Sequence, residues 1–209
     1  DRGLTDEWLA RCIDAGYIAL QLTVAFQGLE KEAISRGEVL SRPKNLQASY
    51  MVDVSLHYLA SNKKPLKNRT RVRFHTGTSE VLGNVILLDR EELAPGEDTV
   101  AQLRLDTPVA LVKDDRFVIR SYSPVFTIGG GKVLNPIPLK HKRFKPDAVE
   151  GLQALGDQSP EAIISFHVEA SGYQGVSFAH LKIITNLPDK KLENVIQVLL
   201  YQKTIIQVD

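Results

Sequence analysis

Apolar and polar residues alternate along a long central part of the chain, from Tyr50 to about Leu134. A period of two is typical of β-strands that bury one face. The pattern recurs in the segments MVDVSLHYL, TRVRFHTG, EVLGNVILL, VAQLRLDTPVALV, DRFVIRSY and GKVLN, with Gly, Pro and Asp turns between them. About six or seven short strands suit a small closed barrel, because closure removes unpaired edges. We therefore predict a β-barrel over residues 49–138.

The pattern before the barrel differs from the pattern within it. TDEWLARCIDAG has an N-cap candidate, Thr5, and apolar residues at helical spacing, so it predicts a short amphipathic helix. Ala19 to Phe26 and Glu38 to Leu40 look like further strands, and Ser41-Arg42-Pro43 would end them. Residues 1–48 are thus predicted to hold an N-terminal helix and the end of another β-domain.

Helical periodicity takes over after Pro138. Ala148 to Leu155 predicts a short helix, so residues 139–158 are interpreted as a basic linker with that helix. Over residues 159–209 we expect three helices. Ser159 caps the first, Ser177 caps the second, and the third begins at Pro188-Asp189. The strand-like segment TIIQVD follows. This order is that of a winged-helix domain. The predicted fold class is therefore mainly β with an α-helical C-terminal part.

Charge is unevenly distributed, although the net charge is only +1. Lys63 to Arg73 is rich in Lys and Arg and has no acid, KHKRFK at Lys140 to Lys145 is also basic, and Asp89 to Asp98 is mostly acidic. Arg71, Arg73 and His75 alternate with apolar residues, so a strand would carry them on one face. That face is the best candidate for an RNA contact, although His75 also fits an ordinary half-exposed strand position.

The sequence lacks two common motifs of catalytic sites. The sequence has no G-x-x-x-x-G-K-[ST] loop and no G-x-S-x-G elbow, and Gly129-Gly130-Gly131-Lys132 lies between strands, where glycines relieve crowding in a barrel. The five histidines lack zinc-ligand spacing, and the one cysteine excludes an internal disulfide. We expect His167 to be a satisfied residue at the core edge. No catalytic residue, metal or cofactor is therefore predicted in this chain.

The strand aromatics are interpreted as barrel core and rim rather than as stacking platforms for bases; they are Tyr50, Tyr58, Phe74, Phe117, Tyr122 and Phe126. No run approaches the roughly 20 apolar residues of a membrane helix, and the first residues lack the pattern of a secretory signal. A cytoplasmic location is the expectation.

Four segments carry a family resemblance: GLEKEAISRGEVLSRP, LKNRTRVRFHTGTSEVLGNVILLDREELAPGE, DRFVIRSYSPVFTIGGGKVLNP and KHKRF. They resemble the elongation-factor-Tu-like proteins and, more narrowly, the bacterial selenocysteine-specific elongation factors. The likeness spans Gly28 to about Phe144, and residues 159–209 are similar to the first winged-helix module of that family. It implies the end of the second domain, the third-domain β-barrel and then a winged helix. Residues 1–16 do not match.

The resemblance implies a translation factor that carries selenocysteinyl-tRNA to the ribosome, while further winged helices hold a messenger-RNA hairpin. GTP and magnesium would bind to a GTPase domain, which we expect to be missing from this chain. We also expect most of the second domain, and any winged helix after Asp209, to be missing. In the family, segments that align with Lys67 to Thr78 and Arg120 to Gly131 contact the tRNA backbone.

We therefore expect a non-catalytic fragment for selenocysteine incorporation that binds the tRNA backbone. Its candidate RNA-binding residues are Lys67, Arg69, Arg71, Arg73, His75, Arg120, Lys140, Lys142 and Arg143. The KHKRF run equally fits a linker that fixes the winged helix to the barrel.

Two other functions compete with this one. The first is a non-catalytic protein-interaction scaffold that packs on a GTPase or a ribosomal protein. The second is a DNA-binding regulator, which is disfavoured because Pro188 to Lys203 contains lysines but no arginine for bidentate base contacts.

Overall fold

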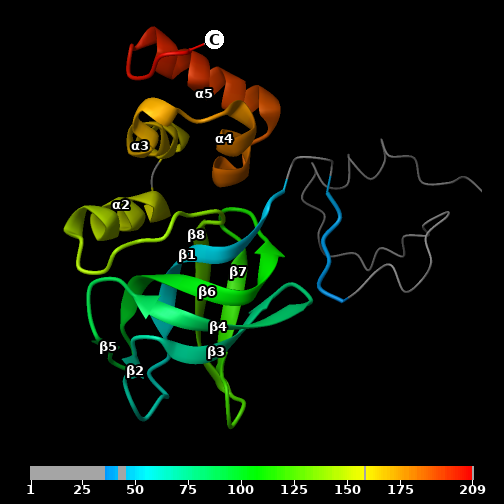
Figure 1. Ribbon diagram of the computed structural model, residues 1–209, viewed down its shortest axis with the longest axis vertical. Coiled ribbons are helices and arrows are strands. Elements are labelled where there is room, and N and C mark those ends of the chain that lie inside the picture. Colours follow the sequence, from blue (N-terminus) through cyan, green and yellow to red (C-terminus); the bar gives the residue numbers. More distant parts are fainter. Residues whose placement is uncertain (1–35, 42–45, 158, 209) are drawn as a thin grey trace, which may run out of the picture. The chain divides into compact units, whose positions relative to one another are not determined.

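The computed structural model describes residues 36–41, 46–157 and 159–208 (Figure 1). The predicted N-terminal helix that begins near Thr5 and the predicted strand Ala19 to Phe26 lie outside these residues.

Six antiparallel strands close into a barrel, in the order β1-β6-β4-β3-β7-β8 (Figure 1). They are β1 (Ala48–Tyr58), β3 (Thr70–Thr76), β4 (Ser79–Leu87), β6 (Asp98–Ala110), β7 (Arg116–Ser121) and β8 (Thr127–Asn135). Two short strands, β2 (Leu66–Lys67) and β5 (Glu92–Leu93), pair as a separate ribbon. The predicted closed barrel is confirmed.

The barrel interior holds the apolar residues of the alternating pattern. Val52, Val54 and Leu56 of β1 are fully buried, and the Phe74 and Phe117 rings stack with centroids 5.4 Å apart. Complete burial of one such side chain is worth about 1.5–3 kcal/mol. Among the other strand aromatics, Tyr58 is buried, whereas Tyr50, Tyr122 and Phe126 are about half exposed. The aromatic residues therefore divide into core and rim, as the alternation predicted.

The glycine run of β8 allows this strand to approach β1 closely. A Cβ atom at Gly131 would lie 1.8 Å from the Ser55 carbonyl oxygen, and one at Gly129 would lie 2.6 Å from the carbonyl oxygen of His57. Only glycine fits such contacts, because no side-chain carbon can share that space. The glycines thus have the architectural role expected of them.

Helix α2 (Pro146–Asp157) is longer than the predicted segment Ala148 to Leu155. It places Val149, Leu152 and Leu155 against an apolar surface outside the barrel lumen, formed by Ile86, Leu88, Val100 and Leu134. Proline tolerates the first turn of a helix, so the helix can begin at Pro146. The helix extends two residues beyond the predicted segment at each end, and packing of this kind stabilises a helix well beyond its intrinsic propensity.

Three further helices follow: α3 (Pro160–Ser171), α4 (Phe178–Thr185) and α5 (Asp189–Tyr201), with a short 3-10 turn η2 (Gly172–Gln174) after α3. The Ser159 hydroxyl accepts a hydrogen bond from the Ala162 N–H, and the Ser177 hydroxyl accepts one from the His180 N–H. Both predicted caps are confirmed. The helices enclose a second core made of Ile164, Leu181, Ile184, Leu192, Val195 and Leu199.

Two predicted strands are wrong. Glu38 to Leu40 and Thr204 to Val208 adopt no strand structure, and no described strand pairs with either segment. Val39 and Leu40 are more than half exposed, as are Ile206 and Val208. β-branched residues favour extended backbone, but a strand also needs a partner for its hydrogen bonds. Among the described residues, no helix combines the length and the hydropathy needed to cross a bilayer.

His167 differs in part from its prediction. It lies on α3 with limited exposure, at the edge of the core as expected, but its Nε2 is buried and makes no hydrogen bond to any described residue. The expectation of a satisfied side chain was therefore wrong. Sequence periodicity locates a residue at a core edge, whereas the partners of its polar atoms depend on tertiary packing.

Candidate nucleic-acid interface

The outer face of β3 presents the predicted basic side chains. Val72 and Phe74 point into the core, so Arg71, Arg73 and His75 lie on the outside. Strand β7 runs antiparallel beside β3 and places Arg120 directly opposite Arg73. Strand pairing therefore joins two parts of the predicted site that are distant in sequence.

Arg71 is held by an acid from another strand. Its two terminal nitrogens donate to the two carboxylate oxygens of Asp106, at 3.2 and 2.5 Å. These hydrogen bonds raise the pKa of Arg71. A bidentate pair fixes the guanidinium plane, so Arg71 is oriented before any ligand arrives.

Arg73 makes contacts with an acid and with an aromatic ring. Its Nη1 lies 2.7 Å from Glu80 Oε1, and its guanidinium carbon lies 5.6 Å from the centre of the Tyr122 ring. The hydrogen bond from Arg73 lowers the pKa of Glu80. Arg73 is therefore charge-compensated in the free protein and also touches an exposed aromatic side chain.

Nitrogen atoms without acceptors gather on this face. Within the described residues, Nε of Arg73, Nε of Arg120 and Nε2 of His75 are buried and make no hydrogen bond. A buried unsatisfied polar group costs roughly 1–3 kcal/mol. Arg120 also has no acidic partner in the described part of the chain. Within the described residues, the positive charge of Arg120 is therefore left uncompensated on this face, which suits an anionic ligand.

The predicted residues next to β3 divide into two groups. Lys67 Nζ lies 3.6 Å from Glu92 Oε1, across the β2–β5 ribbon. Arg69 is exposed in a left-handed turn, with φ of 64°, and no carboxylate in the described residues pairs with it. Arg69 and Arg120 are therefore the uncompensated cations of the predicted set around β3.

Arg143 of the second basic run is bound to the barrel. Its Nε donates to the Leu87 carbonyl at 2.7 Å, its Nη2 donates to the Arg90 carbonyl at 2.6 Å, and its Nη1 lies 2.8 Å from Glu91 Oε1. These contacts support the linker interpretation for Arg143. Lys140 and Lys142 are exposed, and their contact with RNA stays a prediction.

A buried carboxylate beneath the linker was missed by the sequence interpretation. Asp53 of β1 has no exposed surface, and its Oδ2 lies 2.7 Å from Nε2 of His141. Gln102 donates to Asp53 Oδ1 at 3.0 Å and to the Leu139 carbonyl at 2.9 Å. The Asp53 carboxylate raises the pKa of His141. One sequence signal could have identified this carboxylate: Asp53 lies between the apolar residues Val52 and Val54 within a predicted strand.

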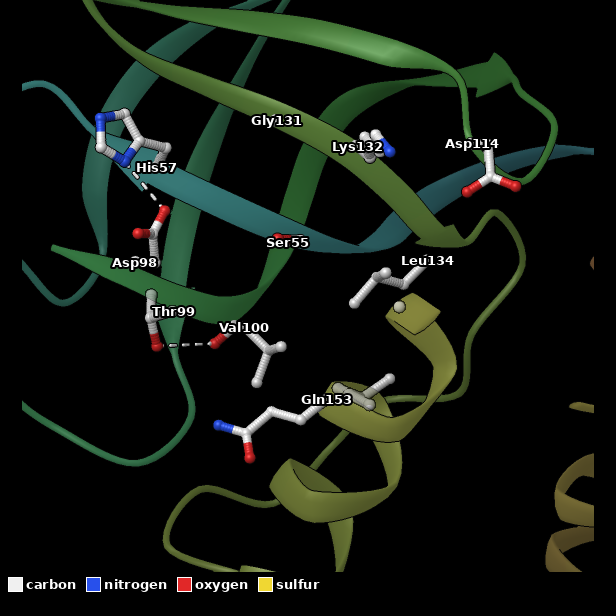
Figure 2. A pocket seen from close by; sticks show the side chains of 12 residues that line it. Ser55, His57, Asp98, Thr99, Val100, Asp114, Gly131, Lys132, Leu134 and Gln153 are labelled. Atoms are coloured by element: carbon white, nitrogen blue, oxygen red, sulfur yellow. Dashed lines mark hydrogen bonds and ion pairs between the residues drawn. The ribbon is translucent and has the colours of Figure 1, made fainter. Parts of the chain in front are cut away.

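A groove lies between the barrel and α2, over β1, β6 and β8 (Figure 2). Its volume is about 370 Å³, and its polar lining includes Ser55, His57, Asp98, Lys132 and Gln153. His57 Nδ1 lies 2.8 Å from Asp98 Oδ1, while the Thr99 hydroxyl donates to the Val100 carbonyl. No hydrogen bond in the described residues joins His57 to a hydroxyl nucleophile, so the groove lacks a nucleophile–base pair.

The described residues also contain no group of three or more His, Cys, Asp or Glu side chains arranged to hold a metal ion. The basic outer face of β3 and β7 therefore remains the arrangement with the clearest chemical purpose.

Comparison with known proteins agrees with the resemblance seen in the sequence. The family model described as the selenocysteine-specific elongation factor, beta-barrel domain, matches residues 53–140. The chain is 38% identical over 186 residues to the selenocysteine-specific elongation factor of Desulfomicrobium baculatum, covering 89% of this chain and 29% of that protein. It is 31% identical over 153 residues to that of Escherichia coli (strain K12), covering 72% and 23%. The chain thus matches less than a third of the length of either relative.

Proposed function

Since this chain belongs to the family of selenocysteine-specific elongation factors, we propose that it grips the phosphate backbone of selenocysteinyl-tRNA through the outer face of β3 and β7. The barrel provides the contacts to tRNA, and the three-helix unit extends towards messenger RNA or the ribosome. We assign no catalytic step to the described residues, and GTP and magnesium would bind to a GTPase domain.

The observation that carries the proposal is the pairing of Arg73 with Arg120. Side chains directly opposite on antiparallel strands have Cβ atoms about 4.5–5.5 Å apart, so two like charges there repel each other. Glu80 compensates Arg73, but no described acid compensates Arg120. A phosphodiester bound between the two guanidinium groups would remove this repulsion.

The acids on the same face have a role in this proposal. Asp106 and Glu80 hold Arg71 and Arg73 in extended, oriented positions, which lowers the entropy lost when RNA binds. Both pairs are substantially exposed, so phosphate groups can compete for the arginines. Contacts of this kind recognise the shape and the backbone of RNA and give no base readout. Discrimination among aminoacyl groups would then have to come from another part of the factor.

A protein-interaction scaffold remains the second candidate, and one observation favours it. Val118, Tyr122, Val125 and Phe126 are between 40% and 50% exposed, on β7 and the loop that follows it. Exposed apolar groups near one another fit a protein partner better than they fit phosphate. A GTPase domain or a ribosomal protein is the partner that this candidate requires.

A salt titration of tRNA binding tests the proposal. We expect the 209-residue chain to bind a selenocysteine-tRNA transcript, with affinity that falls steeply as salt rises, because phosphate contacts release counterions. Arg120→Ala should weaken binding by about tenfold at low salt and should reduce the salt slope by about one. Thermal unfolding of the variant serves as the control for folding. Failure of the unsubstituted chain to bind tRNA at low salt would reject the proposal in favour of the scaffold.

A further inference from the structure

The acids from Asp89 to Asp98 contact basic side chains other than Lys63 and Lys64. The pairs are Asp89 with Arg90, Glu91 with Arg143, Glu92 with Lys67, Glu97 with Arg90 and Asp98 with His57. This segment lies beside the β1–β2 loop, since the Gly96 N–H donates to the Tyr58 carbonyl at 2.8 Å. In the described residues, none of these carboxylates forms an ion pair with Lys63 or Lys64 of that loop.

Three cations nearby remain uncompensated. Lys63 and Lys64 on the β1–β2 loop and Arg69 in the β2–β3 turn are exposed, and none of them forms an ion pair within the described residues. Lys63 and Lys64 did not belong to the predicted RNA-binding set. We call these three residues the end-loop cations.

The backbone that carries the two lysines is held firmly. Asn62 Nδ2 donates to the carbonyls of Leu59 and Ile128 at 2.7 and 2.8 Å, and the Tyr58 hydroxyl donates to the Lys64 carbonyl at 2.9 Å. The Leu59 N–H also donates a hydrogen bond to the Ile128 carbonyl at 3.0 Å. A loop that is already ordered loses little conformational entropy when a ligand binds.

Arg69 is fixed in the same way. Its N–H donates to the Val85 carbonyl at 2.8 Å, and the neighbouring Thr70 hydroxyl donates to the Lys67 carbonyl at 2.6 Å. Arg71, the first arginine on the outer face of β3, follows two residues later. The β1–β2 loop and the β2–β3 turn lie at the same end of the barrel, because β1, β8, β7 and β3 pair antiparallel in that order.

We propose that the end-loop cations form a second phosphate-binding group, which holds RNA backbone beyond the face of β3 and β7. This inference rests on the proposed function and extends its footprint. RNA is favoured over an acidic protein because, in the described residues from 59 to 70, no large apolar side chain is strongly exposed. Protein interfaces depend on apolar and aromatic anchors, whereas phosphate binding needs only presented positive charge.

The test is the double variant Lys63→Gln with Lys64→Gln, measured with the same tRNA transcript over a range of salt concentrations. We expect affinity to fall by about tenfold at low salt and the salt slope to become shallower by about two, one for each lost phosphate contact. Both lysines are exposed, so the thermal unfolding midpoint should stay unchanged.

A matched control removes the same charge elsewhere. Lys190→Gln with Lys191→Gln changes two adjacent, exposed lysines of α5 and should alter affinity by less than about twofold. Equal losses in the two double variants would show a net-charge effect and overturn the inference. Unchanged tRNA binding by the Lys63 and Lys64 variant would also overturn it.

The inference and the proposed function fail in different ways. If the unsubstituted chain does not bind tRNA, both are rejected. If it binds tRNA and responds to Arg120→Ala but not to the change at Lys63 and Lys64, only the second phosphate-binding group is rejected.

Discussion

Individual ionisable residues in this protein perform two separate tasks. Arg73 and Arg120 lie on the outer face of the barrel, where their charge is available to a ligand. Asp53 of β1 lies beneath the linker and contacts His141 of the linker, so their interaction joins two segments that are distant in sequence. In the sequence, residues of both kinds lie within alternating strand patterns or within a basic run. Their surroundings in the fold distinguish binding from anchoring.

The anchoring pair predicts a pH-dependent stability. The pKa of His141 is raised by the Asp53 carboxylate, so the folded state binds this proton more tightly than the unfolded state. The contribution of His141 to stability is therefore complete below its unfolded pKa of about 6.5, and it is lost as pH rises through the higher folded pKa. We expect the unfolding free energy, measured with denaturant, to fall over that range.

His141→Gln is the matched variant for this prediction. It should remove the alkaline loss of stability and cost about 1–3 kcal/mol near pH 6, because the buried Asp53 loses a charged hydrogen-bond partner. An unchanged pH profile in this variant would show that the pair does not control the dependence.

His167 predicts the opposite dependence on pH. Burial lowers its pKa to about 4, with a smaller effect from His180. Protonation then favours the unfolded state, so stability is complete above about pH 6.5 and declines as pH falls towards 4. His167→Leu should abolish this acid-induced loss, measured by helix content during denaturant unfolding. If the variant lost as much stability over pH 4–6.5 as the unsubstituted protein, His167 would not be the cause of the acid-induced loss.

At the scale of secondary-structure elements, β8 shows how closely the barrel strands are packed. It pairs with β1 on one side and with β7 on the other. Gly129 and Gly131 lie against backbone carbonyls of β1, and Gly130 lies against the Phe117 carbonyl of β7. A side chain in this position cannot be accommodated by a rotamer change, because the atom it meets belongs to the backbone.

Gly131→Ala should therefore destabilise the barrel by at least about 3 kcal/mol, or prevent folding, since its Cβ would lie 1.8 Å from the Ser55 carbonyl oxygen. Gly156→Ala is the control. Its Cβ would be 3.9 Å from the nearest atom, Leu134 Cδ2, and alanine is a better helix former than glycine. The control should leave stability unchanged or raise it by up to about 1 kcal/mol in chemical denaturation. Equal stability of the two variants would contradict the close approach of β8 to β1.

For the whole molecule, periodicity was sufficient to predict the barrel and the helix order, because burial of one strand face or one helix stripe is recorded directly in the sequence. It failed for Thr204 to Val208, where local preference for extended structure has no described strand to pair with. The basic residues could be found in the same way, but their acidic partners could not. The contact of Arg71 with Asp106 depends on the folded barrel bringing β3 and a distant part of β6 together.

The closed barrel also limits how this protein can acquire new partners. In a closed ring of strands, ladder hydrogen bonds engage both sides of each strand, so the six barrel strands offer no free edge for a partner to extend. New binding surfaces therefore use the outward-facing side chains and the loops of the barrel rather than a strand edge. Changes at these positions leave the buried residues of the barrel interior in place.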